Sequence, residues 1–89
     1  MKRISYGSGS FVTGDAIAKA VLDYAAALAN ASKSAHLEVP GYDPAGSAAV
    51  SMVIGPASQI LATDEEFGPE LDDEAFVRDL TLRIEELEG

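Results

Sequence analysis

The chain has 89 residues, with 15 acidic and 6 basic side chains, a formal net charge of −9 and no cysteine. This length predicts a single domain over residues 1–89, and the lack of cysteine excludes disulfides, thiolate metal sites and a cysteine nucleophile. Six bases cannot neutralise many phosphates against fifteen acids, so the composition disfavours tight binding to nucleic acid. A small domain without disulfides is typical of a reducing compartment, and we expect a cytoplasmic protein.

The first third of the chain predicts a hairpin and then a helix. Residues 3–6 and 11–13 have the pattern of short strands, on either side of a turn rich in glycine and serine. A helix is expected over residues 15–31, with Thr13 or Asp15 as its N-terminal cap. Its apolar positions span roughly 220°, well beyond the ~100° of an ordinary surface helix. We therefore expect this helix to be covered on more than one side.

The middle of the chain predicts three more strands, over residues 36–39, 47–54 and 58–63. They are joined by turns that contain glycine and proline. Both faces of the strand at 47–54 are largely apolar, which indicates a central position in a sheet that is covered on both sides. Residues 64–71 then form an acidic connector, which a Gly-Pro pair interrupts, to a C-terminal helix.

The C-terminal helix places its large apolar residues on one line and leaves a single leucine, Leu82, on the opposite side. Two oppositely charged pairs at a spacing of four residues, Glu74–Arg78 and Asp79–Arg83, are expected to form ion pairs along this helix. The three acids in its last turns oppose the helix dipole, so this end of the helix is expected to fray.

The predicted element order is therefore ββαβββα. Successive strands joined by short turns predict an antiparallel sheet of about five strands. Two helices packed on that sheet give an α+β two-layer sandwich, and the opening hairpin is expected to pair with an edge of the sheet.

Residues 44–63 carry no charged side chain, which raises the question of a membrane span. Two glycines, two prolines, several serines and one glutamine interrupt this run, and its apolar residues recur with a period of two. Such a period is typical of strands rather than of a helix, so no membrane helix and no membrane partner are predicted.

The candidates for catalysis and metal binding are weak. Gly7, Gly9 and Gly14 match neither of the recognised phosphate-binding patterns. His36, the only histidine, shares a strand face with Glu38, but two ligands do not hold a metal tightly, and a solvent-facing pair is the favoured interpretation. A small hydrolase that uses His36 stays a third alternative without a nucleophile-elbow sequence to support it. We therefore predict no catalytic residue, no cofactor and no metal.

The acidic charge is concentrated at the C-terminal end, where eleven acids stand against two bases from residue 64 onward. The carboxylate clusters at 64–66 and 72–74 lack the spacing of an EF-hand loop, so they do not predict a calcium site. Some of the acids are expected to cap or pair within the last helix, which leaves six without a structural role. These six residues are where a basic partner would have to bind: Asp64, Glu65, Glu66, Glu85, Glu86 and Glu88.

Association has the strongest physical motive, because the wide apolar arc of the first helix and the outward Leu82 would both be covered in a symmetric dimer. We therefore expect a non-enzymatic module that binds a protein partner or a second copy of itself. The alternative is a monomeric inhibitor, or a protein of the immunity or antitoxin type, that engages a basic surface through its acidic C-terminal third.

Overall fold

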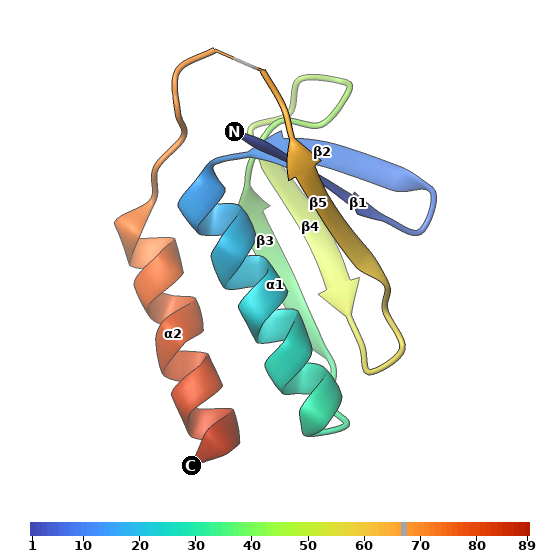
Figure 1. Cartoon of the computed structure of the whole chain (residues 1–89), viewed down its shortest axis with the longest axis vertical. Coiled ribbons are helices and arrows are strands. Elements are labelled where there is room, and N and C mark those ends of the chain that lie inside the picture. The colour runs from blue at the N-terminus through green and yellow to red at the C-terminus, as the bar shows by residue number, and fades with distance from the viewer. Residues whose placement is uncertain (67) are drawn as a thin grey trace.

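The computed structural model describes residues 1–66 and 68–89, and these form five strands and two helices (Figure 1). The α+β class and the order ββαβββα are confirmed. The elements are β1 (Lys2–Tyr6), β2 (Gly9–Thr13), α1 (Asp15–Asn30), β3 (Ala35–Pro40), β4 (Ala49–Ile54), β5 (Ile60–Asp64) and α2 (Glu74–Glu88).

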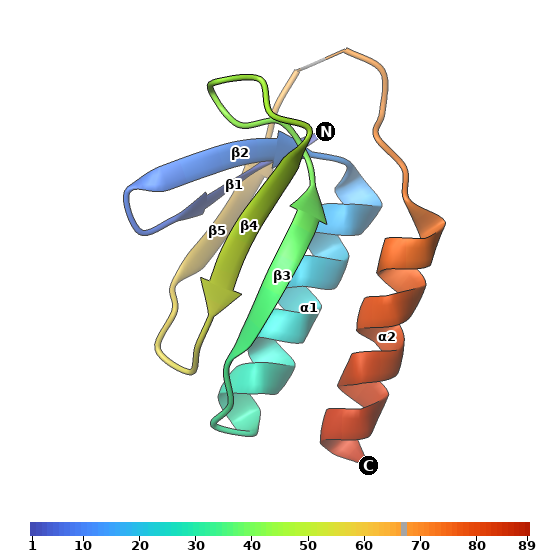
Figure 2. The ribbon, with the colours of Figure 1, turned by 180° about the vertical axis from the view of Figure 1, so that it is seen from behind.

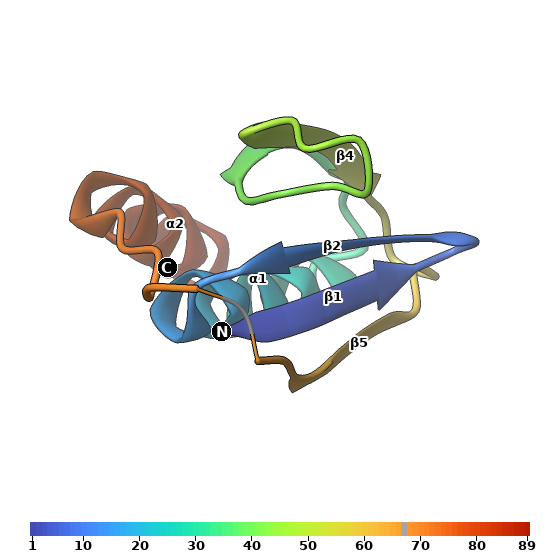
Figure 3. The same cartoon turned by 90° about the horizontal axis from the view of Figure 1, so that it is seen from above.

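The strands form two antiparallel sheets, so the predicted single sheet of five strands is wrong. One sheet has the order β2-β1-β5, and the other contains β3 and β4 (Figure 3). The five residues after β4 carry the chain away from it, and β5 pairs with β1, where Ala62 lies opposite Ile4. The opening hairpin pairs with β5 alone, whereas the sequence predicted that it would join an edge of one sheet containing all three later strands. Polarity alternation fixes which face of a strand is buried, but it does not choose the neighbouring strand.

β4 is an edge strand, which corrects the prediction of a central one. No described strand pairs with its second side, and its outer face lies in solvent. Met52 and Ile54 point into the core, whereas Val53 on the other face is 67% exposed. The apolar residues on both faces of this strand therefore do not reflect cover on both sides.

The core lies around α1, which packs against both sheets on one side and against α2 on the other (Figures 1 and 2). Ile17 and Val21 of α1 are fully buried, as are Ile4 from β1 and Leu80 from α2. This arrangement confirms that α1 is covered on more than one side. It also accounts for the wide apolar arc of α1 within a single chain, so that arc no longer requires a dimer.

The connector between β5 and α2 packs over the first turn of α1. The Glu70 carboxylate accepts the backbone N–H of Asp15 at 2.5 Å, so the cap of α1 comes from the connector and not from Thr13 or Asp15 as predicted. A Cβ on Gly14 would lie 1.7 Å from the carbonyl oxygen of Leu71, so this close packing requires glycine. Of the predicted connector, residue 64 belongs to β5, and Phe67 lies outside the described residues.

Candidate functional site

Two of the six acids predicted to lack a structural role do have one. Asp64 forms an ion pair with Lys2, and the Glu65 carboxylate lies 2.8 Å from the Arg3 guanidinium. Hydrogen bonds from these cations lower the pKa of both carboxyl groups. The prediction failed here because the pairing of β5 with β1 brings together residues that are 62 positions apart in the sequence.

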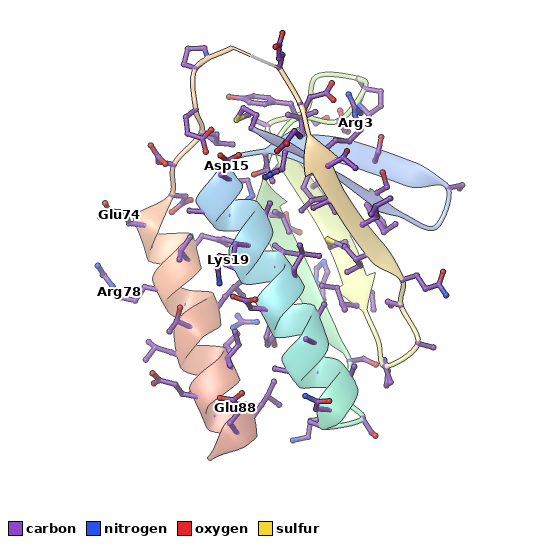
Figure 4. The ribbon with its side chains drawn as sticks, in the orientation of Figure 1. Arg3, Asp15, Lys19, Glu74, Arg78 and Glu88 are labelled. Carbon is purple, nitrogen blue, oxygen red and sulfur yellow. The ribbon has the colours of Figure 1, made fainter. Side chains whose placement is uncertain are left out.

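Only one of the two predicted ion pairs along α2 is present among the described residues. Asp79 and Arg83 lie 3.1 Å apart, as expected. Arg83 also hydrogen-bonds the buried Tyr24 of α1, and this bond is the main cause that raises the pKa of its guanidinium. No ion pair joins Glu74 to Arg78 in the described part of the chain, and Figure 4 shows Arg78 pointing away from α1 into open space.

The remaining acids do not gather into one site. The connector lies at the end of the molecule opposite the C-terminus, so its acids and those in the last turns of α2 form two separate groups (Figure 1). Glu86 adds to the field that raises the pKa of Arg83. Leu82 is 52% exposed on the outer side of α2, and the acids at the end of this helix are exposed as well. These three acids are Glu85, Glu86 and Glu88.

His36 and Glu38 lie on the solvent-facing side of β3, as predicted. His36 Nε2 is 3.6 Å from Glu38 Oε1, and the Ser51 hydroxyl of β4 donates to the same carboxylate oxygen at 2.5 Å. A catalytic serine would instead donate its hydroxyl proton toward the imidazole that acts as its base. These contacts are those of an exposed cross-strand polar pair, and they do not favour the hydrolase alternative.

The structure draws attention to the uncharged residues 44–63, whose lack of charge the sequence analysis used only to ask whether they span a membrane. They contain β4 and β5, and each of these strands lies at an edge of its sheet. Three large apolar side chains are exposed in the described part of the molecule, and two of them, Val53 and Leu61, lie in this segment. The segment shares its lack of charge with the centres of protein interfaces, which are depleted in charged residues.

Hydrogen-bonded residues alternate along β4, and this alternation shows which backbone groups point to the side that no described strand pairs. This side is called the β4 edge below. Gly41 donates its N–H to the carbonyl oxygen of Ala48 at 3.2 Å, in the same register that pairs β3 with β4. Backbone groups of alternate residues point to opposite sides of an antiparallel strand. Val50, Met52 and Ile54 therefore bond to β3, and the N–H and C=O groups directed at the β4 edge belong to Ala49, Ser51 and Val53.

The free side of β5 differs from the β4 edge in its charge. The N–H of Glu65 donates to Met1 at 3.2 Å, so by the same alternation Ile60, Ala62 and Asp64 direct their backbone groups outward. The last residue of β5, Asp64, carries a carboxylate that is paired with Lys2. A hollow beside β5 is lined by uncharged residues, namely Ser5, Tyr6, Gly7, Gln59, Ile60 and Leu61.

Residues 1–66 and 68–89 offer neither a membrane-spanning helix nor a metal-binding cluster. Neither helix is long and apolar enough to cross a membrane. In this part of the chain no three histidine or carboxylate side chains come together in a way that would hold a metal ion. No protein family, curated protein or solved structure matches the chain.

Proposed function

We propose that this chain is a non-enzymatic protein-interaction module of the cytoplasm, which binds its partner by strand addition at the β4 edge. One observation carries the proposal: at three residues β4 presents backbone groups that no described strand pairs, beside the exposed Val53, in a strand without charge or proline. Natural proteins usually protect such edges with charges, prolines or bulges. An edge left open over six residues is therefore a surface that a partner strand would cover.

The chemistry of the β4 edge determines what kind of partner fits. In strand addition, backbone hydrogen bonds supply affinity, and side chains at alternate positions supply specificity. A partner strand beside β4 would form backbone hydrogen bonds with the N–H and C=O groups of Ala49, Ser51 and Val53. Because the Val53 side chain is 67% exposed, an apolar or small residue on the partner would bury it.

A basic partner bound through the acidic C-terminal third is the second candidate. The specific observation in its favour is that Glu85, Glu86 and Glu88 remain exposed at the end of α2. Asp64 and Glu65 add less to such a surface than the sequence suggested, because each already faces a cation of β1.

Capture of binding partners at two salt concentrations separates the two candidates. Exposed charge contacts weaken between 0.1 and 0.5 M salt, because the Debye length falls from about 10 Å toward about 3 Å. Contacts at the β4 edge are backbone hydrogen bonds and apolar packing, so we expect the partner to survive 0.5 M salt and to be lost from Val53→Lys.

The matched control is the triple variant Glu85→Gln, Glu86→Gln, Glu88→Gln, which should keep the same partner. A partner that is lost in 0.5 M salt and from the triple variant, but is retained by Val53→Lys, would support the basic-partner candidate and overturn strand addition.

A further inference from the structure

We infer that the strand covering the β4 edge is β4 of a second copy of this chain, antiparallel to the first, with a twofold axis at Ser51. The inference rests on the proposed strand addition and names its partner. Three observations carry it: the spacing of the outward backbone groups, the position of the nearest charges and the side chains that come to face one another.

The outward backbone groups of β4 are symmetric about Ser51. Ala49 and Val53 each stand two residues from it, so an antiparallel copy places Ala49 opposite Val53 of the second copy and Ser51 opposite its own mate. Each such pair exchanges two hydrogen bonds, so three pairs make six bonds and leave no outward group of the strand unpaired. A twofold contact of this kind uses the same patch on both copies and closes at two chains.

The charges permit this contact although each chain carries −9. β4 has no charged residue, and the nearest carboxylate along the ladder is Glu38 on β3, opposite Ser51. In the four-stranded sheet of the dimer, the two Glu38 residues are three strand spacings apart, about 14 Å at about 4.8 Å each. That separation exceeds the Debye length of about 8 Å at physiological salt, so their repulsion is largely screened.

Twofold contacts centred on β5 or α2, where the other exposed apolar residues lie, would be less favourable than the contact at β4. A twofold axis at Ala62 of β5 would set the half-buried Ile60 against Asp64 of the second copy. Such a contact places a carboxylate against an apolar side chain, which costs solvation energy. On α2, Leu82 stands among the charged residues of an acidic helix. At β4, by contrast, the half-buried Val50 would face Met52 of the second copy on the inner side of the sheet.

Sedimentation velocity of the purified chain from about 1 to 500 μM tests the dimer. The edge contact is smaller than a standard interface of about 1,600 Å², so we expect a dimer with a Kd in the micromolar range. Amide hydrogen exchange should show Ala49, Ser51 and Val53 gaining protection as the concentration rises. The amides of Val50 and Met52 already bond to β3, so they serve as the internal reference.

A lysine on the edge strand supplies the matching variant. Val53→Lys replaces an apolar side chain of the dimer contact with a hydrated charge, the change by which natural edge strands resist pairing, and should raise the Kd at least about tenfold. Leu61→Lys is the matched control, because it makes the same change at a residue that is 60% exposed on β5, and it should leave the Kd unchanged. Thermal unfolding of both variants verifies that they fold. If Val53→Lys does not fold, amide exchange of the unmodified chain decides whether the dimer forms at the β4 edge.

Three results would overturn the dimer: a monomer at 500 μM, a dimer that Val53→Lys leaves intact, or species that keep growing beyond two copies. Growing species would mean that β4 pairs with a different edge of the next copy. A monomer whose capture of another protein is abolished by Val53→Lys would remove the dimer and leave the proposed strand addition standing. If Val53→Lys affects neither self-association nor capture, both proposals fall.

Discussion

The acidic residues 64–89 and the uncharged residues 44–63 occupy neighbouring stretches of the chain, yet the fold uses them in opposite ways. In the acidic part, several carboxylates find partners inside the molecule: Glu70 caps α1, Asp73 caps α2 through the N–H of Phe76 at 3.0 Å, and Asp64 faces Lys2. In the uncharged part, two sheet edges keep backbone groups that no described strand pairs.

This difference shows that an excess of acidic residues in the sequence does not mean that those acids lack partners in the fold. A carboxylate on a flexible side chain can reach a nearby ammonium or N–H group, so some of the acids are paired within the folded chain. A strand edge has fixed backbone groups that only another strand satisfies along their whole length.

The largest effect is expected for Gly14→Ala, which tests whether the acidic connector is structural. Its Cβ would meet the Leu71 carbonyl oxygen at 1.7 Å, so the connector must move off α1. We expect a loss of about 3 kcal/mol, because overpacking costs about 1–3 kcal/mol and the backbone oxygen cannot give way. Urea unfolding measures the loss. Gly68→Ala is the control, since its Cβ meets nothing within 4 Å, and equal stabilities of the two variants would contradict the structural role.

Removal of the Glu70 side chain is the next test. Glu70→Ala deletes the acceptor that caps the first N–H group of α1, and the loss of a cap costs about 1 kcal/mol. Glu70→Gln, which keeps an acceptor oxygen, should recover part of the loss. Glu66→Ala, at an exposed acid of the same connector, should change the free energy of unfolding little. A larger effect at Glu66 than at Glu70 would reverse the roles assigned to these two acids.

The pH dependence of stability tests Asp64 and Glu65. Their folded pKa values lie below the ordinary 3.8 and 4.5, so the unfolded chain binds more protons in that range. Their contribution is fully present above about pH 4.5 and disappears as the pH falls through the lowered values. Asp64→Asn combined with Glu65→Gln should therefore flatten the fall of unfolding free energy from pH 5 to 3. Lys2→Gln combined with Arg3→Gln should flatten it too, and an unchanged slope in both would contradict the pairing.

The smallest effect is expected at the end of α2. Glu88→Lys replaces an acid that opposes the helix dipole, so it should raise the free energy of unfolding by about 0.3–0.5 kcal/mol at low salt. Glu74→Lys makes the same change in the first turn and should lower it by a similar amount. Denaturant titration at two salt concentrations measures both. A gain at both ends would mean that total charge, rather than the helix dipole, sets the effect.

Part of this fold was predictable from local patterns. Helix periodicity placed α1 within one residue of its observed end, and turn residues set the element order. The wide apolar arc of α1 correctly predicted cover on more than one side, although the cover is intramolecular. The candidate acids were only partly understood, because the cations that pair with Asp64 and Glu65 come from a strand at the other end of the sequence.

The sequence by itself determined the type and order of the elements, the acidic charge from residue 64 onward and the uncharged run at 44–63, because these depend on residue types within a short window. Only the tertiary structure decided that β5 leaves β4 for β1, that Glu70 caps α1 and that the uncharged run forms two sheet edges. The physical reason is that strand partners are chosen by long-range backbone pairing and by competition for cover over the core. Side-chain alternation is the same whichever neighbour a strand takes.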